Sequence, residues 1–223
     1  MADVRPLTDL FSFLGARRQA DASVEAESRG AAAELTYPTK ALQKFLVTLR
    51  GRENPVLIDL GPVVGRNVSF FGEELGCRIR VEDIEADIDT HVKQRTLDRL
   101  PEFFTTRFKE PPGSVDGILC WDVIDYLDRK AAQTLATALT AMLRPDGALL
   151  GFFNSGAAGE SVYTKYVVVD QTTLRHRTYP ALRARQRNLL NGDIIRLFKG
   201  LRVTDSYLMK SNMREMLFKK SLS

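Results

Sequence analysis

Apolar and polar residues follow two different periods along the chain, and each change of period marks the border of an element. Runs or strict alternations of apolar residues predict strands over 55–60, 77–83, 115–121, 148–153, 163–169, 174–179, 201–209 and 214–219. Apolar residues that recur every three or four positions predict helices over 38–49, 67–75, 84–100, 129–143 and 192–199. Because strands and helices alternate through most of the chain, the sequence predicts an α/β protein with a mostly parallel sheet.

Capping and turn residues support several of these borders. Asp128 and Asn191 each stand where a side chain can cap the helix that comes after it. Gly76 comes directly after a predicted helix and is expected to end it. The short polar link Ser211-Asn212 between the last two strands predicts an antiparallel hairpin.

The order of the elements predicts a doubly wound, Rossmann-like fold. Its sheet is expected to have seven strands, mostly parallel, with the antiparallel hairpin at the C-terminal end. The third strand is expected to be very short or missing, because residues 84–100 are typical of a helix and prolines at 101, 111 and 112 interrupt the chain after it. The predicted domain spans residues 38–223, and residues 1–37 form an N-terminal extension that is partly flexible.

Composition narrows the class of protein. The chain has 223 residues, of which 44% are hydrophobic, and this is enough for one large domain with a substantial core. Its formal net charge of +4 does not by itself indicate nucleic acid. Cys77 and Cys120 both fall in predicted strands, which favours buried thiols in a reducing compartment. With no secretory leader pattern and no apolar run near the roughly 18 residues of a membrane span, the expected location is the cytoplasm, with no membrane partner.

The first candidate for a functional site is the end of the first strand of the sheet, at Asp59. A turn with Gly61 and Gly65 comes next and leads into a helix. Gly61 can take a tight turn because it lacks a Cβ, and Gly65 is expected to let the helix lie close to the strand. The N–H groups at the start of that helix would then face a nucleotide-like cofactor.

The second strand ends in two acids, Glu82 and Asp83. In a parallel sheet this end lies beside the end of the first strand, close to the glycine turn. A carboxylate there can accept hydrogen bonds from both hydroxyls of a ribose. Asp83 is the first candidate, and Glu82, which points to the opposite face, is the alternative.

A longer series of motifs resembles a known family. The glycine turn, the acid-ended second strand, residues 116–122 (Asp-Gly-Ile-Leu-Cys-Trp-Asp) and residues 143–147 (Leu-Arg-Pro-Asp-Gly) together resemble the class I S-adenosylmethionine-dependent methyltransferases, of the type 11/12 kind. The resemblance covers roughly residues 38–220 and is most specific over 116–153. It implies S-adenosylmethionine as the cofactor and methyl transfer as the activity.

The resemblance also implies a set of cofactor-binding residues, which are Asp59, Gly61, Gly65, Asp83, Trp121 and Asp122. The first three match the family's D-x-G-x-G-x-G turn, the fourth matches its ribose-binding acid, and the last two lie at the end of its fourth strand beside the cofactor and the acceptor. The chain departs from the pattern at Val63, where the middle glycine is expected, and the acid near the adenine has no clear counterpart. These departures leave a non-catalytic, cofactor-binding or regulatory protein of the same fold as the alternative.

The sequence does not identify a catalytic residue. Methyl transfer depends chiefly on positioning, and an acceptor that is a hydroxyl or a protonated amine also needs a base. The candidates are Asp122, Tyr163 and His176, of which the last two lie where the family builds its acceptor pocket. Taken alone, a histidine among arginines is typical of a surface residue. The cysteines and histidines lack metal-ligand spacing, so no metal is expected.

An arginine cluster begins in the second strand of the predicted pair and continues beyond it, and its members are Arg175, Arg177, Arg183, Arg185 and Arg187. Such a cluster binds phosphates of RNA or of an acidic metabolite, or forms salt bridges at the surface. The lead hypothesis is methyl transfer to a small-molecule acceptor, and an RNA methyltransferase is a lesser alternative. A nicotinamide-dependent oxidoreductase is disfavoured by the terminal hairpin and by the length of one domain. The sequence indicates neither the acceptor nor the oligomeric state.

Overall fold

The structure is a computed structural model that describes residues 34–156, 159–186 and 189–222. Most of the predicted N-terminal extension, residues 1–33, therefore lies outside the described residues, as does Arg187. No helix within the described ranges is long and apolar enough to span a bilayer.

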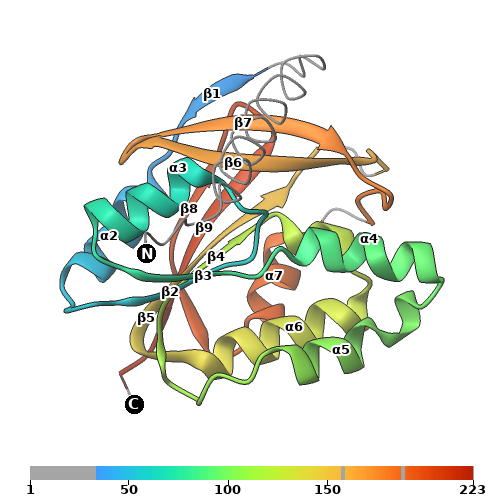
Figure 1. The fold of residues 1–223 in the computed structure, drawn as a ribbon, viewed down its shortest axis with the longest axis horizontal. Helices are drawn as coiled ribbons and strands as arrows, with labels where there is room; N and C mark the ends of the chain where they lie inside the picture. The colour runs from blue at the N-terminus through green and yellow to red at the C-terminus, as the bar shows by residue number, and fades with distance from the viewer. Residues whose placement is uncertain (1–33, 157–158, 187–188, 223) are drawn as a thin grey trace, which may run out of the picture. The chain divides into compact units, whose positions relative to one another are not determined.

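A six-stranded sheet in the order β3-β2-β4-β5-β9-β8 forms the centre of the described part (Figure 1). The strands are β2 (Val56–Asp59), β3 (Arg78–Val81), β4 (Val115–Trp121), β5 (Leu143–Asn154), β8 (Leu201–Leu208) and β9 (Met213–Lys220). The strands β3, β2, β4 and β5 pair in parallel, and β9 pairs antiparallel with both β5 and β8. The doubly wound α/β class and the antiparallel C-terminal hairpin are confirmed.

The sheet has six strands and not seven, and the missing one is the third strand, which was expected to be very short or missing: the chain between β3 and β4 is helical. It forms α4 (Ile84–Gln94), a short 3₁₀ turn (Leu97–Arg99) and α5 (Leu100–Arg107). In the described residues no strand pairs with the outer edge of β3. Arg80 of β3 forms ion pairs with Glu82 and Glu110, and charged groups of this kind discourage further strand pairing.

A second, three-stranded sheet has the order β1-β7-β6 and is antiparallel throughout. Its strands are β1 (Leu35–Pro38), β6 (Val162–Asp170) and β7 (Thr173–Pro180). The β6–β7 pair matches the predicted strand pair closely. β1 was not predicted: three of its four residues lie within the segment assigned to the extension.

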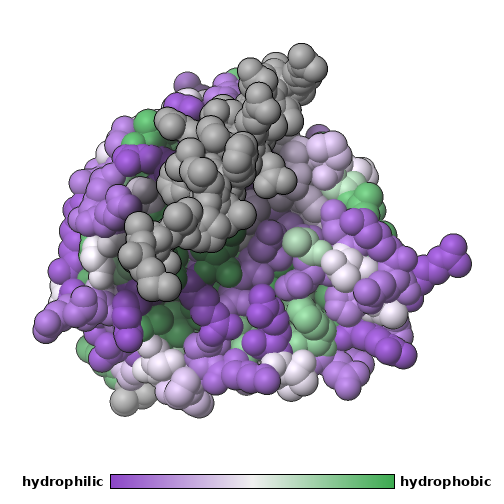
Figure 2. Space-filling model, viewed as in Figure 1, coloured by the Kyte–Doolittle hydropathy of each residue, from purple (hydrophilic) through white to green (hydrophobic). Residues whose placement is uncertain are grey.

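Helices and the second sheet cover the two faces of the six-stranded sheet, and two hydrophobic cores result. One core joins the sheet to α4, α5, α6 (Arg129–Met142) and α7 (Asn191–Leu197). The other joins it to α2 (Ala41–Arg50), to the helical stretch made of α3 (Gly65–Val68) and the π-helical turn η1 (Ser69–Glu74), and to β6 and β7. Leu57 faces the second core and its neighbour Ile58 faces the first, so the strand is buried on both faces. Hydrophilic residues cover most of the face drawn in Figure 2 outside its grey region.

The predicted caps have different outcomes. The Asp128 carboxylate accepts a hydrogen bond from the Ala131 N–H at 2.9 Å, as expected for the cap of α6. The prediction for Asn191 is wrong, because α7 begins at that residue and the N-cap is the extended Leu190, which offers no side-chain acceptor. Gly76 lies just beyond the helical stretch 65–74 with a φ of +67°, a conformation that favours glycine.

Candidate functional site

The candidate site lies at the carboxyl ends of β3, β2 and β4. The chain leaves β2 to form β3 on one side of it and returns later as β4 on the other side. This reversal is the topological switch point of the sheet, where α/β proteins bind their ligands.

The glycine turn and the acid of β3 are brought together there. The Leu60 N–H donates to the Leu119 carbonyl at 2.9 Å, which holds the end of β2 against β4. The Gly61 carbonyl accepts a hydrogen bond from the Asp83 N–H at 3.2 Å. Turn and acid therefore lie at the same edge of the sheet, as the sequence predicted.

Gly61 is required by the close approach of an indole ring. A Cβ at this position would lie 2.8 Å from Cδ1 of Trp121. Its φ is not among the positive values of the described chain, so the reason differs from the backbone freedom expected from the sequence. The Trp121 indole N–H in turn donates to the Asp59 carboxylate at 2.6 Å, which spans the switch point.

Asp59 is the buried centre of the turn. One carboxylate oxygen accepts both the Trp121 indole N–H and the Gly61 N–H, the latter at 3.0 Å. Burial raises the pKa of Asp59 to about 6, against the opposing effect of these two donors. Its role is to fix the turn and the tryptophan relative to each other.

Gly65 and Val63 lie in more open surroundings. Among the described residues no atom lies within 4 Å of the place that a Cβ of Gly65 would occupy. The expectation that this glycine allows close packing of helix on strand is therefore wrong. Val63 is 67% exposed, so its side chain does not fill the space between the turn and Asp83.

The two acids at the end of β3 differ in their partners. Glu82 is buried and forms ion pairs with Arg80 and with Arg107, the latter at 2.7 Å. Asp83 is half-buried, and one of its oxygens caps α4 by accepting the Ala86 N–H at 3.2 Å. Of the two, only Asp83 has a carboxylate that no cation holds in the described contacts.

Two residues with positive φ that are not glycines flank β2. Asp83 has a φ of +44° and Trp121 a φ of +47°. Such conformations are unfavourable for these residue types, and they often occur at functional sites. The two lie at the ends of β3 and β4, on either side of the glycine turn.

Asp122 comes directly after β4 and is completely buried. Arg185 donates to its Oδ2 at 3.1 Å, and the Tyr126 hydroxyl lies 3.4 Å from the same atom. Desolvation raises the pKa of Asp122, although Arg185 acts in the opposite direction. Its Oδ1 has no hydrogen-bond partner in the described part of the chain.

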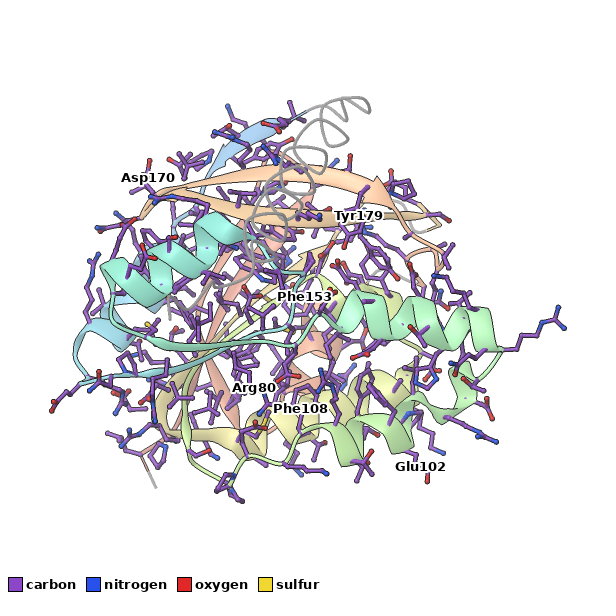
Figure 3. The ribbon with its side chains drawn as sticks, in the orientation of Figure 1. Arg80, Glu102, Phe108, Phe153, Asp170 and Tyr179 are labelled. Atoms are coloured by element: carbon purple, nitrogen blue, oxygen red, sulfur yellow. The ribbon has the colours of Figure 1, made fainter. Side chains whose placement is uncertain are left out.

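The sequence missed Glu85, an acid in the first turn of α4. It is 1% exposed, and its carboxylate accepts the hydroxyl hydrogen of Tyr179, the residue of β7 labelled in Figure 3. Desolvation, and to a lesser extent repulsion from Asp122, raises the pKa of Glu85 to about 9. The position of Glu85, two residues after Asp83, indicated that it could lie near the site. The helical pattern alone did not show that β7 would bury its side chain.

The other two catalytic candidates lie within packed surroundings. The Tyr163 hydroxyl donates to Asp89 at 2.8 Å. His176 is buried between the rings of Tyr37 and Tyr166, with centroids 4.5 and 4.8 Å away. The interpretation of His176 as a surface residue is wrong, because pairing of β1 and β6 with β7 encloses it. This burial lowers the pKa of His176 to about 4.

The arginine cluster does not form one continuous basic surface. Arg175 and Arg177 both pair with Glu34 across the β1–β7 border. Arg185 is buried between Asp122 and Glu160. Arg183 is also buried, without an ion pair among the described residues.

Comparison with known proteins gives similarity of structure only. No protein-family model and no curated protein matches the chain. A 1,6-didemethyltoxoflavin-N1-methyltransferase from Burkholderia thailandensis, with bound 1,6-didemethyltoxoflavin and S-adenosylhomocysteine, is 20% identical with a TM-score of 0.47, and the match covers 98% of this chain and 93% of that one. A TehB-like methyltransferase from Corynebacterium glutamicum is 14% identical with a TM-score of 0.48, over 94% of this chain and 99% of that one.

An S-adenosylmethionine-dependent methyltransferase from Clostridium acetobutylicum is 13% identical with a TM-score of 0.48, over 81% of this chain and 91% of that one. At these identities and TM-scores the likeness carries no argument about activity, which has to be argued from the site.

Proposed function

We propose that the protein is a class I S-adenosylmethionine-dependent methyltransferase that acts on a small-molecule acceptor. The supporting observation is the hydrogen bond between Gly61 and Asp83 beside the switch point, with Trp121 and Asp122 at the end of the adjacent strand. These four residues are among the six that the sequence resemblance implies for cofactor binding, and the departure at Val63 remains.

The residues at this edge fit the proposed cofactor. Asp83 has a carboxylate that no cation holds in the described contacts, which suits the two hydroxyls of a ribose. Gly65 begins the helical stretch 65–74 without a side-chain cap, and open space lies beside it. The free N–H groups at the start of this helical stretch suit the carboxylate of the methionine part of the cofactor. When bound, S-adenosylmethionine supplies an electrophilic methyl group.

The chain's own contribution is orientation and exclusion of water. Trp121 stacks on Tyr166 with centroids 5.0 Å apart and an angle of 5° between the planes, which makes a rigid apolar wall. Arg185 and Asp122 cross-link the end of β4 to the segment after β7. Such a frame favours catalysis by positioning the acceptor in line with the methyl group.

None of the three catalytic candidates is placed as a general base. Asp122 is paired with Arg185, and the Tyr163 hydroxyl donates a hydrogen bond to Asp89. His176 is enclosed by aromatic rings. The proposed acceptor is therefore a group that is nucleophilic without loss of a proton to the enzyme.

Titration calorimetry tests the proposal with S-adenosylmethionine, S-adenosylhomocysteine and NAD as ligands. We expect both sulfur compounds to bind and NAD not to bind. Asp83→Ala should weaken binding by about 2 kcal/mol, because a charged partner of the ribose is lost. The exposed Glu102 provides the control variant Glu102→Ala, which should bind as the wild type does.

Absence of binding of either sulfur compound at millimolar concentration would remove the proposal. Unchanged affinity in Asp83→Ala would place the ribose elsewhere. Binding without methyl transfer to any of a broad set of small acceptors would favour the non-catalytic alternative, which Val63 in the glycine turn supports.

A further inference from the structure

Arg183 is a buried cation that forms no ion pair with the described residues. It is 9% exposed, and its Nε and Nη1 atoms have no hydrogen-bond acceptor within the described part of the chain. Desolvation lowers its pKa from the ordinary value. Arg185, two residues further on and equally buried, is held by Asp122 and Glu160.

A buried carboxylate can be neutralised by taking up a proton, but the guanidinium group of Arg183 cannot be neutralised by losing one. Glu85 and Asp125 are also buried with an oxygen that lacks a partner among the described residues, but a carboxyl group can take up a proton, and burial raises the pKa of both in that direction. A guanidinium group stays protonated at any pH at which a protein is folded. Arg183 therefore carries a positive charge that the described contacts leave uncompensated, which is an unusual and unfavourable arrangement.

Hydrogen bonds on both sides hold the backbone that carries Arg183. The Ala181 N–H donates to the Ser161 carbonyl at 3.1 Å, and the Leu182 N–H donates to the Asp89 carboxylate at 3.2 Å. The Arg185 N–H donates to the Glu160 carbonyl at 3.0 Å. The position of Arg183 is thus fixed by its neighbours and not by its own side chain.

The surroundings of Arg183 connect it to the proposed acceptor side. The Asp89 carboxylate accepts hydrogen bonds from the Leu182 N–H, one residue before Arg183, and from the Tyr163 hydroxyl, at 3.2 and 2.8 Å. The Tyr163 ring lies 4.7 Å from that of Tyr126, whose hydroxyl reaches Asp122 at 3.4 Å. Asp89 and two tyrosines therefore connect the residue before Arg183 to Asp122, directly after β4.

We propose that Arg183 binds a carboxylate or phosphate group of the acceptor, and that the substrates of this protein are anionic small molecules. The inference rests on the proposed function for the identity of the acceptor side. An incoming anion would supply the acceptors that Nε and Nη1 lack, and a guanidinium can bind such a group through two parallel hydrogen bonds.

The test uses the full chain saturated with S-adenosylhomocysteine and three probes of similar size, namely benzoate, phenyl phosphate and the neutral benzamide. We expect saturable binding of at least one anion and none of benzamide. Arg183→Gln should weaken the binding at least tenfold, and Arg183→Lys should retain part of it. Arg175→Gln, which removes a guanidinium that already has a partner, Glu34, should leave it unchanged.

Thermal unfolding without any anion gives a second readout. Because Arg183 lacks a partner in the described contacts, Arg183→Gln should unfold at the same temperature as the wild type or at a higher one, and the anions should stabilise the wild type alone. A variant that fails to fold, or binding that survives Arg183→Gln, would overturn the inference. If S-adenosylhomocysteine binds and neither anion does, the inference alone fails. If the anions bind through Arg183 and the cofactor does not bind, the proposed function fails.

Discussion

The two ends of β4 carry buried aspartates with opposite surroundings. Asp116, near the start, is 4% exposed, and its carboxylate accepts the Val56 N–H at 2.8 Å. It also pairs with Arg52 at 3.1 Å and with Arg144 at 3.0 Å. Asp122, directly after the strand, is fully buried and has one arginine partner and an oxygen without a partner in the described residues.

The difference separates a structural end of the sheet from the candidate functional end. Asp116 ties the starts of β2, β4 and β5 together, and its charge is compensated. At the other end, Asp122, Asp125 and Glu85 each keep a buried oxygen without a partner in the described part of the chain, and their pKa values are raised. Proteins rarely leave buried polar groups unsatisfied, and clusters of perturbed carboxyl groups are typical of functional sites.

The largest expected effect concerns the pH dependence of stability at the carboxyl end. The pKa of Glu85 lies at about 9 in the folded chain against an ordinary value of 4.5, so the folded state holds this proton more tightly. Stability from this group is full at low pH and is lost as the pH rises toward the folded pKa. Glu85→Gln keeps an acceptor for Tyr179 and removes the titration. As the pH rises from about 5 toward about 9, the variant should gain several kcal/mol of stability relative to the wild type.

Denaturant unfolding at several pH values measures this gain. Glu102→Gln, a change at an exposed acid of α5 labelled in Figure 3, is the control and should behave as the wild type does. Parallel stability curves for wild type and Glu85→Gln would show that Glu85 is not buried as a neutral acid, and the contrast between the two ends would weaken.

A smaller effect on stability is expected when an aspartate is replaced by asparagine at each end of β4. Asp116→Asn removes the charge that compensates Arg52 and Arg144 and should destabilise the protein by about 2 kcal/mol near neutral pH. Asp125→Asn should cost less than about 1 kcal/mol, because burial raises the pKa of Asp125 and so favours a neutral group there, and Asn can still accept the Asn154 N–H. Urea unfolding of the two variants checks the difference, and equal losses would contradict it.

The elements that the sequence predicted well are those whose signals are local. β4 was predicted with its observed bounds, because an apolar run bounded by turn residues is typical of a buried strand. The cap at Asp128 and the terminal hairpin were also local signals. β1 was missed because its pairing with β7 depends on residues more than a hundred positions away.

The features of the candidate site also fall into two groups, those that the sequence could predict and those that it could not. The proximity of Gly61 and Asp83 results from the order of parallel strands and could be predicted. The reason for Gly61 could not, because it depends on the side chain of Trp121 from another strand. The Asp122–Arg185 pair and the burial of His176 likewise arise from the segment after β5, whose path the sequence leaves open.

The smallest expected effect compares the two glycines of the turn itself. Gly65 starts α3 with open space around the place of a Cβ, so Gly65→Ala should stabilise the free protein by about 0.5–1 kcal/mol through the unfolded chain. Gly61→Ala should destabilise it, since the new methyl group would meet the Trp121 ring. If Gly65 is retained for approach of the proposed cofactor, Gly65→Ala should also bind S-adenosylhomocysteine more weakly in calorimetry. A variant that is more stable and binds equally well would show that the space beside Gly65 is not part of the binding site.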